Sequence, residues 1–127
     1  MKHVLNESEM KNFNISEFDS PDLKGSGKNM QESTLIALDN AREIAGIPFL
    51  INSGYRTRSH NKKVNGVSDS SHLHGYAVDI RAIGSWTRMR IVSALMDAGF
   101  NRIGIGKKFV HADNDPNKIQ NVIWLYR

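Results

Sequence analysis

Apolar residues recur at helical spacing in two parts of the chain. Over residues 30–45 they fall at mixed spacings of three and four, and Gly46 follows where a helix C-cap commonly has glycine. Over residues 85–99, Ser85 suits the N-cap and Gly99 suits the helix end. One face of this second segment would be apolar, and its members are Met89, Val92, Leu95 and Met96. The pattern predicts two main helices.

Short runs rich in β-branched and aromatic residues predict extended segments. These runs lie at residues 48–55, 74–83, 102–113 and 120–127. The dense turn signal "NDPNK" separates the last two, which we expect to pair as an antiparallel hairpin. The order of the segments predicts a single α+β domain, in which two main helices pack against a mostly antiparallel sheet.

The remaining segments lack a regular apolar pattern. Residues 13–30 contain proline, glycine and serine among few apolar residues, so we expect an N-terminal arm or loop over residues 1–29 and a folded domain over residues 30–127. Residues 59–66 would form a short polar helix. The length of 127 residues is that of one domain.

Composition limits the chemistry and the partners. The chain has no cysteine, which excludes a thiol nucleophile and zinc–thiolate sites and leaves histidine, carboxylates and hydroxyls. The formal net charge of +4 favours anionic partners but is modest for a dedicated nucleic-acid binder. No apolar run approaches the length of a membrane span, and the N-terminus lacks the apolar stretch of a signal peptide. We therefore expect synthesis in the cytoplasm and no membrane partner.

The stretch "SSHLHGYAVD" at residues 70–79 carries the first candidate site. His72 and Asp79 are seven residues apart, and a turn at Gly75 could aim both side chains into one cleft. With a third ligand they would match a catalytic zinc site that keeps one position for water. His111 in "FVHAD" is that candidate, and Asp113 would share its face of a strand. Asp113 could accept a proton from water or support a ligand, and all of these residues could equally be ordinary surface polar groups.

These motifs resemble those of a known family. "SGYRT" at residues 53–57, the pattern Ser70-x-His72-x-x-Gly75-x-Ala77-x-Asp79, and "FVHAD" at residues 109–113 are similar, in order and spacing, to the M15 metallopeptidases. That family includes zinc D-alanyl-D-alanine carboxypeptidases and phage cell-wall endopeptidases. The resemblance covers residues 30–127.

The resemblance implies roles for several residues. His72, Asp79 and His111 would bind Zn²⁺, and Arg56 would contact the substrate with its fixed fork of donors. Further substrate contacts would come from Ser70, His74 and Tyr76.

The sequence departs from the family pattern at one position. Many M15 enzymes have a catalytic Glu or Asp three residues before the last zinc histidine, where this chain has Lys108. Lysine cannot serve as a carboxylate base. Asp113 is our candidate for the missing base, and Asp115 and Asp69 are weaker ones.

The implied function is zinc-dependent hydrolysis of an amide bond in peptidoglycan peptides, by a carboxypeptidase or an endopeptidase. The partner would be a wall peptide, with no nucleic acid, and the protein would be a monomer. A phage or prophage lysis enzyme that reaches the wall after release fits these expectations. Two alternatives are a non-catalytic zinc-binding module that recognises wall peptide or a protein partner, and a nucleic-acid binder that uses the basic residues 56–63.

Overall fold

Five strands form one mixed sheet in the computed structural model, which describes residues 10–126. The strands lie in the order β1-β2-β4-β3-β5. Their bounds are Ile51–Ser53 for β1, Ala77–Arg81 for β2, Arg102–Ile105 for β3, Phe109–Asp113 for β4 and Val122–Leu125 for β5. Neighbouring strands are antiparallel, apart from β3 and β5, which are parallel. The predicted α+β class and the mostly antiparallel sheet are confirmed.

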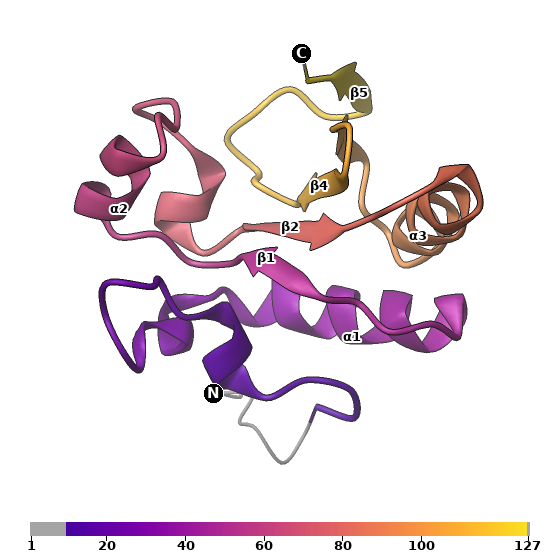
Figure 1. The fold of residues 1–127 in the computed structure, drawn as a ribbon, viewed down its shortest axis with the longest axis horizontal. Coiled ribbons are helices and arrows are strands. Elements are labelled where there is room, and N and C mark those ends of the chain that lie inside the picture. Colours follow the sequence, from indigo (N-terminus) through magenta and orange to yellow (C-terminus); the bar gives the residue numbers. More distant parts are fainter. Residues whose placement is uncertain (1–9, 127) are drawn as a thin grey trace.

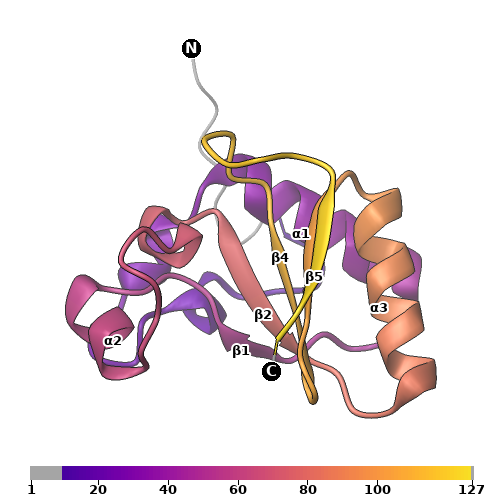
Figure 2. The same cartoon turned by 90° about the horizontal axis from the view of Figure 1, so that it is seen from above.

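Two main helices, α1 (Glu32–Ala45) and α3 (Ser85–Asp97), pack against each other on one side of the sheet (Figures 1 and 2). On the other side lie the short helix α2 (Arg58–Lys63), the 3-10 turn η4 (Ser71–His74) and the connection from β4 to β5 (Figure 1). The long helices therefore cover one face of the sheet, and only short elements lie on the other face, which is called the open face below. Within the described part of the chain, every helix is too short or too polar to cross a membrane.

Helix α1 follows the sequence pattern closely. Leu35, Leu38 and Ala41 are buried at spacings of three, and they pack in the main core. Gly46 adopts φ = 66° at the C-cap, and its N–H donates to the carbonyl of Arg42. Glycine adopts this left-handed conformation without a steric penalty. The predicted helix and its glycine cap are confirmed.

Helix α3 lies where it was predicted, but its buried face differs in part. Leu95 is buried as expected, together with Ile91 and Ala94, whereas Met89 and Met96 are 69% and 58% exposed. Apolar residues lie on two overlapping sides of this helix. The side that contains the small residue Ala94 is the one that packs in the core beside α1. The predicted N-cap is also wrong: the cap residue precedes Ser85, which is the first residue of the helix.

The last three strands connect differently from the prediction. The segment 102–113, expected to be one strand, turns back at Gly106, so that β3 and β4 form an antiparallel hairpin. Strand β5 then pairs in parallel with β3. The expected antiparallel hairpin between the last two predicted strands is therefore wrong. Strand β2 occupies the other edge of β4, and β5 lies at the outer edge of β3.

The segment before α1 is part of the core. Two 3-10 turns, η2 (Ile15–Phe18) and η3 (Ser26–Asn29), shape it. Its buried apolar side chains belong to the same cluster as those of the sheet and helices, and they are Met10, Phe13, Phe18 and Met30. The division into an arm over residues 1–29 and a domain over residues 30–127 stays a prediction, but these described side chains pack in the same core as the rest of the chain. Residues 1–9 of the predicted arm lie outside the described residues.

Replacing Phe18 by alanine tests whether this segment stabilises the domain. The side chain is fully buried beside the ring of Phe13, with ring centroids 5.5 Å apart. We expect Phe18→Ala to lower the free energy of unfolding by about 3–5 kcal/mol. Leu23→Ala is the control, because Leu23 is 51% exposed and its loss should change stability by about 0.5 kcal/mol or less. Equal denaturant midpoints for the two variants would contradict the packing described.

Candidate metal centre

The open face of the sheet carries a row of residues at its centre. Strand register places Ser53 opposite Asp79, Asp79 opposite His111, His111 opposite Gly104, and Gly104 opposite Trp124. Residues in register on adjacent strands point to the same face. The sheet therefore brings Asp79 and His111 together although they are distant in sequence.

His72 reaches this row from the turn η4. The Ser70 side chain accepts a hydrogen bond from the His72 N–H at 3.2 Å, and Gly75 ends the turn with φ = 75°. A Cβ atom at Gly75 would lie 2.2 Å from the carbonyl oxygen of Asn29, so no larger residue fits without a backbone shift. The turn at Gly75 that the sequence analysis required is confirmed, and it directs His72 toward Asp79.

Three side chains converge at one point. His72 Nε2 lies 3.3 Å from Asp79 Oδ1, and His111 Nδ1 lies 3.0 Å from the same oxygen. One potential ligand atom from each residue lies within 4.8 Å of the others. Both imidazoles are buried, at 2% and 6% exposure. The structure thus brings together the predicted trio, whose role as metal ligands stays a prediction.

Outer hydrogen bonds determine which ring nitrogen of each histidine faces Asp79. His72 Nδ1 lies 2.7 Å from the carbonyl oxygen of Gly54, which can only accept, so Nδ1 donates and Nε2 is the nitrogen that faces Asp79. His111 Nε2 lies 2.7 Å from Asp113 Oδ2, so Nε2 donates and Nδ1 faces the centre. Metal-binding histidines commonly have such a partner on the second nitrogen.

Arg56 holds the second oxygen of Asp79. Its Nη2 lies 3.2 Å from Asp79 Oδ2, while Nε donates to Ser53 Oγ and Nη1 to Asn61 Oδ1. The backbone N–H of Arg56 also donates to the carbonyl of His72 at 3.0 Å. The "SGYRT" motif therefore holds both the carboxylate of Asp79, a candidate ligand, and the turn that carries His72.

Asp113 is buried, and both of its oxygens have hydrogen-bond donors. Oδ2 accepts from His111, and Oδ1 accepts from Arg102 Nε at 2.7 Å and from the N–H of Asp115 at 3.2 Å. The sequence analysis allowed two roles for this residue, as a proton acceptor or as a support for a ligand. These contacts favour the supporting role.

Burial and mutual contact shift the pKa values of these groups. Burial lowers the pKa of His72, and the neighbouring Asp79 opposes this only in part. Burial also disfavours charged His111, but hydrogen bonds to Asp113 and Asp79 outweigh it and raise its pKa. For both aspartates, burial opposes ionisation, yet hydrogen bonds from the histidines lower the pKa below its ordinary value. The carboxylates are thus in the ionised form that a metal requires.

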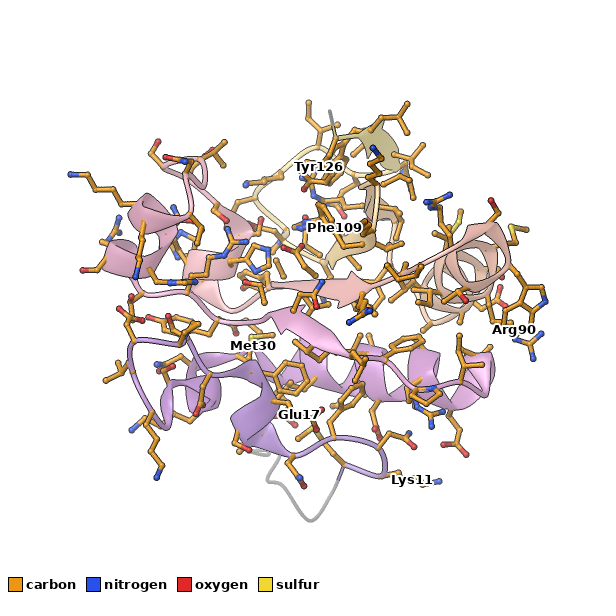
Figure 3. The ribbon with its side chains drawn as sticks, viewed as in Figure 1. Lys11, Glu17, Met30, Arg90, Phe109 and Tyr126 are labelled. Atoms are coloured by element: carbon orange, nitrogen blue, oxygen red, sulfur yellow. The ribbon has the colours of Figure 1, made fainter. Side chains whose placement is uncertain are left out.

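The trio lies in a cavity of about 410 Å³. Trp124, Tyr126 and Phe109 form an aromatic wall of the cavity beside His111. The ring centroids of Phe109 and Tyr126 are 5.0 Å apart. Figure 3 shows these two residues close to each other. A Cβ atom at Gly104 would lie 2.5 Å from the Tyr126 ring, so this glycine makes room for the wall. Sequence reasoning missed these aromatics. The alternating glycines of "RIGIG" were a signal, because they leave one face of a strand without side chains.

The other predicted site residues lie in different places. Ser70 lines the same cavity, but His74 and Tyr76 line a separate depression together with Tyr55. Their assignment to the substrate site stays a prediction. Lys108, at the position of the family's usual carboxylate, is exposed in the turn between β3 and β4.

Two further predicted residues were the weaker candidates for the base, and neither lines the cavity. Asp115 accepts a hydrogen bond from Ser71 Oγ at 2.8 Å and is buried. Asp69 is exposed.

The donor set fits a zinc ion. Two imidazole nitrogens and one carboxylate oxygen make the three-ligand set of a catalytic zinc site. Tetrahedral coordination with bonds of about 2.0 Å separates ligand atoms by about 3.3 Å. The observed 3.0 and 3.3 Å contacts of Asp79 Oδ1 are close to that separation. The residues present could therefore hold Zn²⁺ with little rearrangement.

The sequence matches the model of a known protein family. A family model described as Peptidase M15 matches residues 11–113, a range that contains all three candidate ligands, Arg56 and Asp113. Two of the three residues of the aromatic wall, Trp124 in strand β5 and Tyr126 directly after it, follow the matched range. No curated protein matches the chain in sequence.

Metal binding by the trio is directly testable. We expect the metal-stripped protein to bind one Zn²⁺ per chain. We expect His72→Ala to weaken zinc binding by on the order of 100-fold or more, because loss of an outer hydrogen bond to a ligand alone costs roughly 10–100-fold in affinity. Competition with a chromophoric chelator measures the affinity. His74→Ala is the matched control, because His74 lies on the same turn but outside the cavity. Equal affinities of the two variants would contradict the assignment.

Proposed function

The chain belongs to the peptidase M15 family, and from this premise we propose that it hydrolyses an amide bond in peptidoglycan peptides with the help of Zn²⁺. The proposal rests on one observation above all. His72 Nε2, Asp79 Oδ1 and His111 Nδ1 face one another in a cavity open to substrate, and the second nitrogen of each histidine is held by another group. Such an arrangement is typical of a catalytic metal site.

The aspartate and the two histidines would contribute differently to zinc binding. A bound Zn²⁺ would supply Lewis-acid polarisation of the scissile carbonyl and would acidify the attacking water. Asp79 contributes the negative charge. With Zn²⁺ bound, the two imidazoles would be neutral ligands, because their outer nitrogens keep the protons and the nitrogens that face the ion carry none. Burial of the histidines keeps bulk water away from these bonds.

Arg56 has donors left for the substrate. A guanidinium carries five N–H groups, and Ser53, Asn61 and Asp79 accept from three of them. The side chain lines the cavity beside the candidate ligands. We propose that its remaining N–H groups bind the scissile carbonyl oxygen as charge develops on it, or a carboxylate next to the scissile bond.

We propose that Asp113 acts through His111. Its Oδ2 holds the proton on His111 Nε2, so that Nδ1 would be the nitrogen that binds Zn²⁺ with its lone pair. Arg102 in turn fixes Asp113 by the 2.7 Å contact of its Nε. This role needs no free oxygen on Asp113, whereas proton transfer from water would.

In our proposal, Ser70 lies near the scissile bond, and His74 and Tyr76 lie farther from it. Ser70 lines the cavity and keeps its O–H free to donate, since its oxygen accepts from His72 N–H. His74 and Tyr76 lie along the depression on the other side of the turn η4. We propose that they contact parts of the wall polymer farther from the bond that is cut.

Digestion of purified peptidoglycan tests the proposed function. We expect the protein to release fragments that mass spectrometry assigns to cleavage of one amide bond, with activity lost in EDTA and restored by added zinc. His111→Ala should be inactive because it removes a ligand. Full activity of thoroughly demetallated protein would refute the metal mechanism. Zinc binding and wall binding without any fragment release would instead favour a non-catalytic module.

Asp113→Asn separates the two roles of that residue. The amide removes the charge that holds His111 but keeps the shape, so we expect zinc affinity to fall by about 10-fold or more. At saturating zinc, turnover should recover to within several-fold of the parent. A general base contributes about 10²–10⁴-fold, so a loss of that size at saturating zinc, with unchanged affinity, would identify Asp113 as the proton acceptor.

A further inference from the structure

The arginines and aspartates that line the cavity of the candidate metal centre form ion pairs with one another. Among the described residues, one lysine of this cavity forms none. Arg56 contacts Asp79 at 3.2 Å, and Arg102 contacts Asp113 at 2.7 Å. Lys118 lines the same cavity and is half-buried. Within residues 10–126 its ammonium forms no ion pair and no hydrogen bond. Among the described residues that line the cavity, Lys118 is therefore a cation without a counter-charge.

The loop that carries Lys118 is held on both sides. Gln120 Nε2 donates to the carbonyl of Lys118 at 2.8 Å and to that of Asp115 at 2.9 Å. Arg102 Nη1 donates to the carbonyl of Ile119, which follows directly. The backbone at Lys118 is thus fixed to the same arginine that holds Asp113. A fixed backbone lowers the entropy lost when the side chain binds a ligand.

We propose that Lys118 determines specificity by binding a free carboxylate of the substrate. The inference rests on the proposed function, because it takes the substrate to be a wall peptide. The anionic groups of such peptides are carboxylates, and an ammonium in a partly desolvated cavity attracts a carboxylate strongly. The lysine side chain is long and has three donors, so it can reach a group at some distance from the scissile bond.

The position of Lys118 in the chain agrees with a role in specificity. The family match ends at residue 113, after the last candidate ligand. Lys118 belongs to the connection between β4 and β5, beyond that range. The groups proposed for catalysis thus lie in the part shared with the family, whereas Lys118 lies on a connecting loop, where binding specificity commonly varies.

Two forms of one peptide test the inference. The first is the stem pentapeptide L-Ala-D-isoglutamyl-L-Lys-D-Ala-D-Ala with free carboxylates, and the second has D-isoglutamine and a C-terminal amide in their place. We expect Lys118→Met to raise KM for the free acid by about 10-fold or more, with kcat within about twofold, and to leave KM for the amide unchanged. Lys118→Arg should restore most of the loss, because it restores the charge.

Lys107→Met is the matched control. It removes the same charge from an exposed lysine in the turn between β3 and β4, outside the cavity. We expect it to change KM for both peptides by less than about twofold, since exposed charges are screened by solvent and salt. Two results would overturn the inference. One is the same rise in KM for Lys107→Met and Lys118→Met, and the other is an equal rise in the KM of Lys118→Met for the free acid and for the amide.

Calorimetric binding to the metal-stripped protein, which cannot turn over, separates this inference from the proposed function. We expect the parent to bind the free acid more tightly than the amide, and Lys118→Met to bind both equally. If the zinc-loaded parent cleaves neither peptide while this preference holds, the proposed function fails and the role of Lys118 stands. If both peptides are cleaved without any dependence on Lys118, the role of Lys118 fails and the proposed function stands.

Discussion

The carboxylate of Asp79 is the group on which the arrangement of the site depends. One of its oxygens contacts both His72 and His111, and the other contacts Arg56. These three partners come from the turn η4, the strand β4 and the connection between β1 and α2, so a single side chain joins elements that are far apart in sequence. A buried carboxylate without such partners would be costly, because the protein interior solvates charge poorly. The sheet register that sets Asp79 beside His111 therefore also decides where the other groups lie.

Charges of opposite sign alternate along this part of the molecule. Arg56, Asp79, His111, Asp113 and Arg102 follow one another, each within hydrogen-bond distance of the next. Each carboxylate lies between an arginine and an imidazole, so neither is left as an uncompensated buried charge. Networks of this kind stiffen a site because no member can move without losing a partner. The rigidity suits a centre that must keep three ligand atoms in place while substrates come and go.

Most helix ends and turns could be predicted from the sequence, whereas the pairing of the last strands could not. Gly46 and Gly75 were predictable because each ends an element in a conformation that glycine adopts readily. The convergence of the three candidate ligands followed from motif spacing and the family resemblance. The parallel pairing of β5 with β3 was not predictable, because no local signal states which sheet edge remains free. Without that pairing, Trp124 and Tyr126 could not be placed beside His111, although strict alternation put them on one face.

The contact between the N-terminal segment and the site has a practical consequence. A Cβ atom at Gly54 would lie 2.8 Å from the backbone of Phe18, and the carbonyl of Gly54 holds His72. The N–H of Gln31 likewise donates to the carbonyl of Gly75 at 2.9 Å. Both ends of the loop that carries His72 therefore contact residues that precede α1. Anyone who grafts this catalytic unit onto another protein, as a fusion or a chimaera, has to transfer it from residue 10 onward rather than from the first long helix.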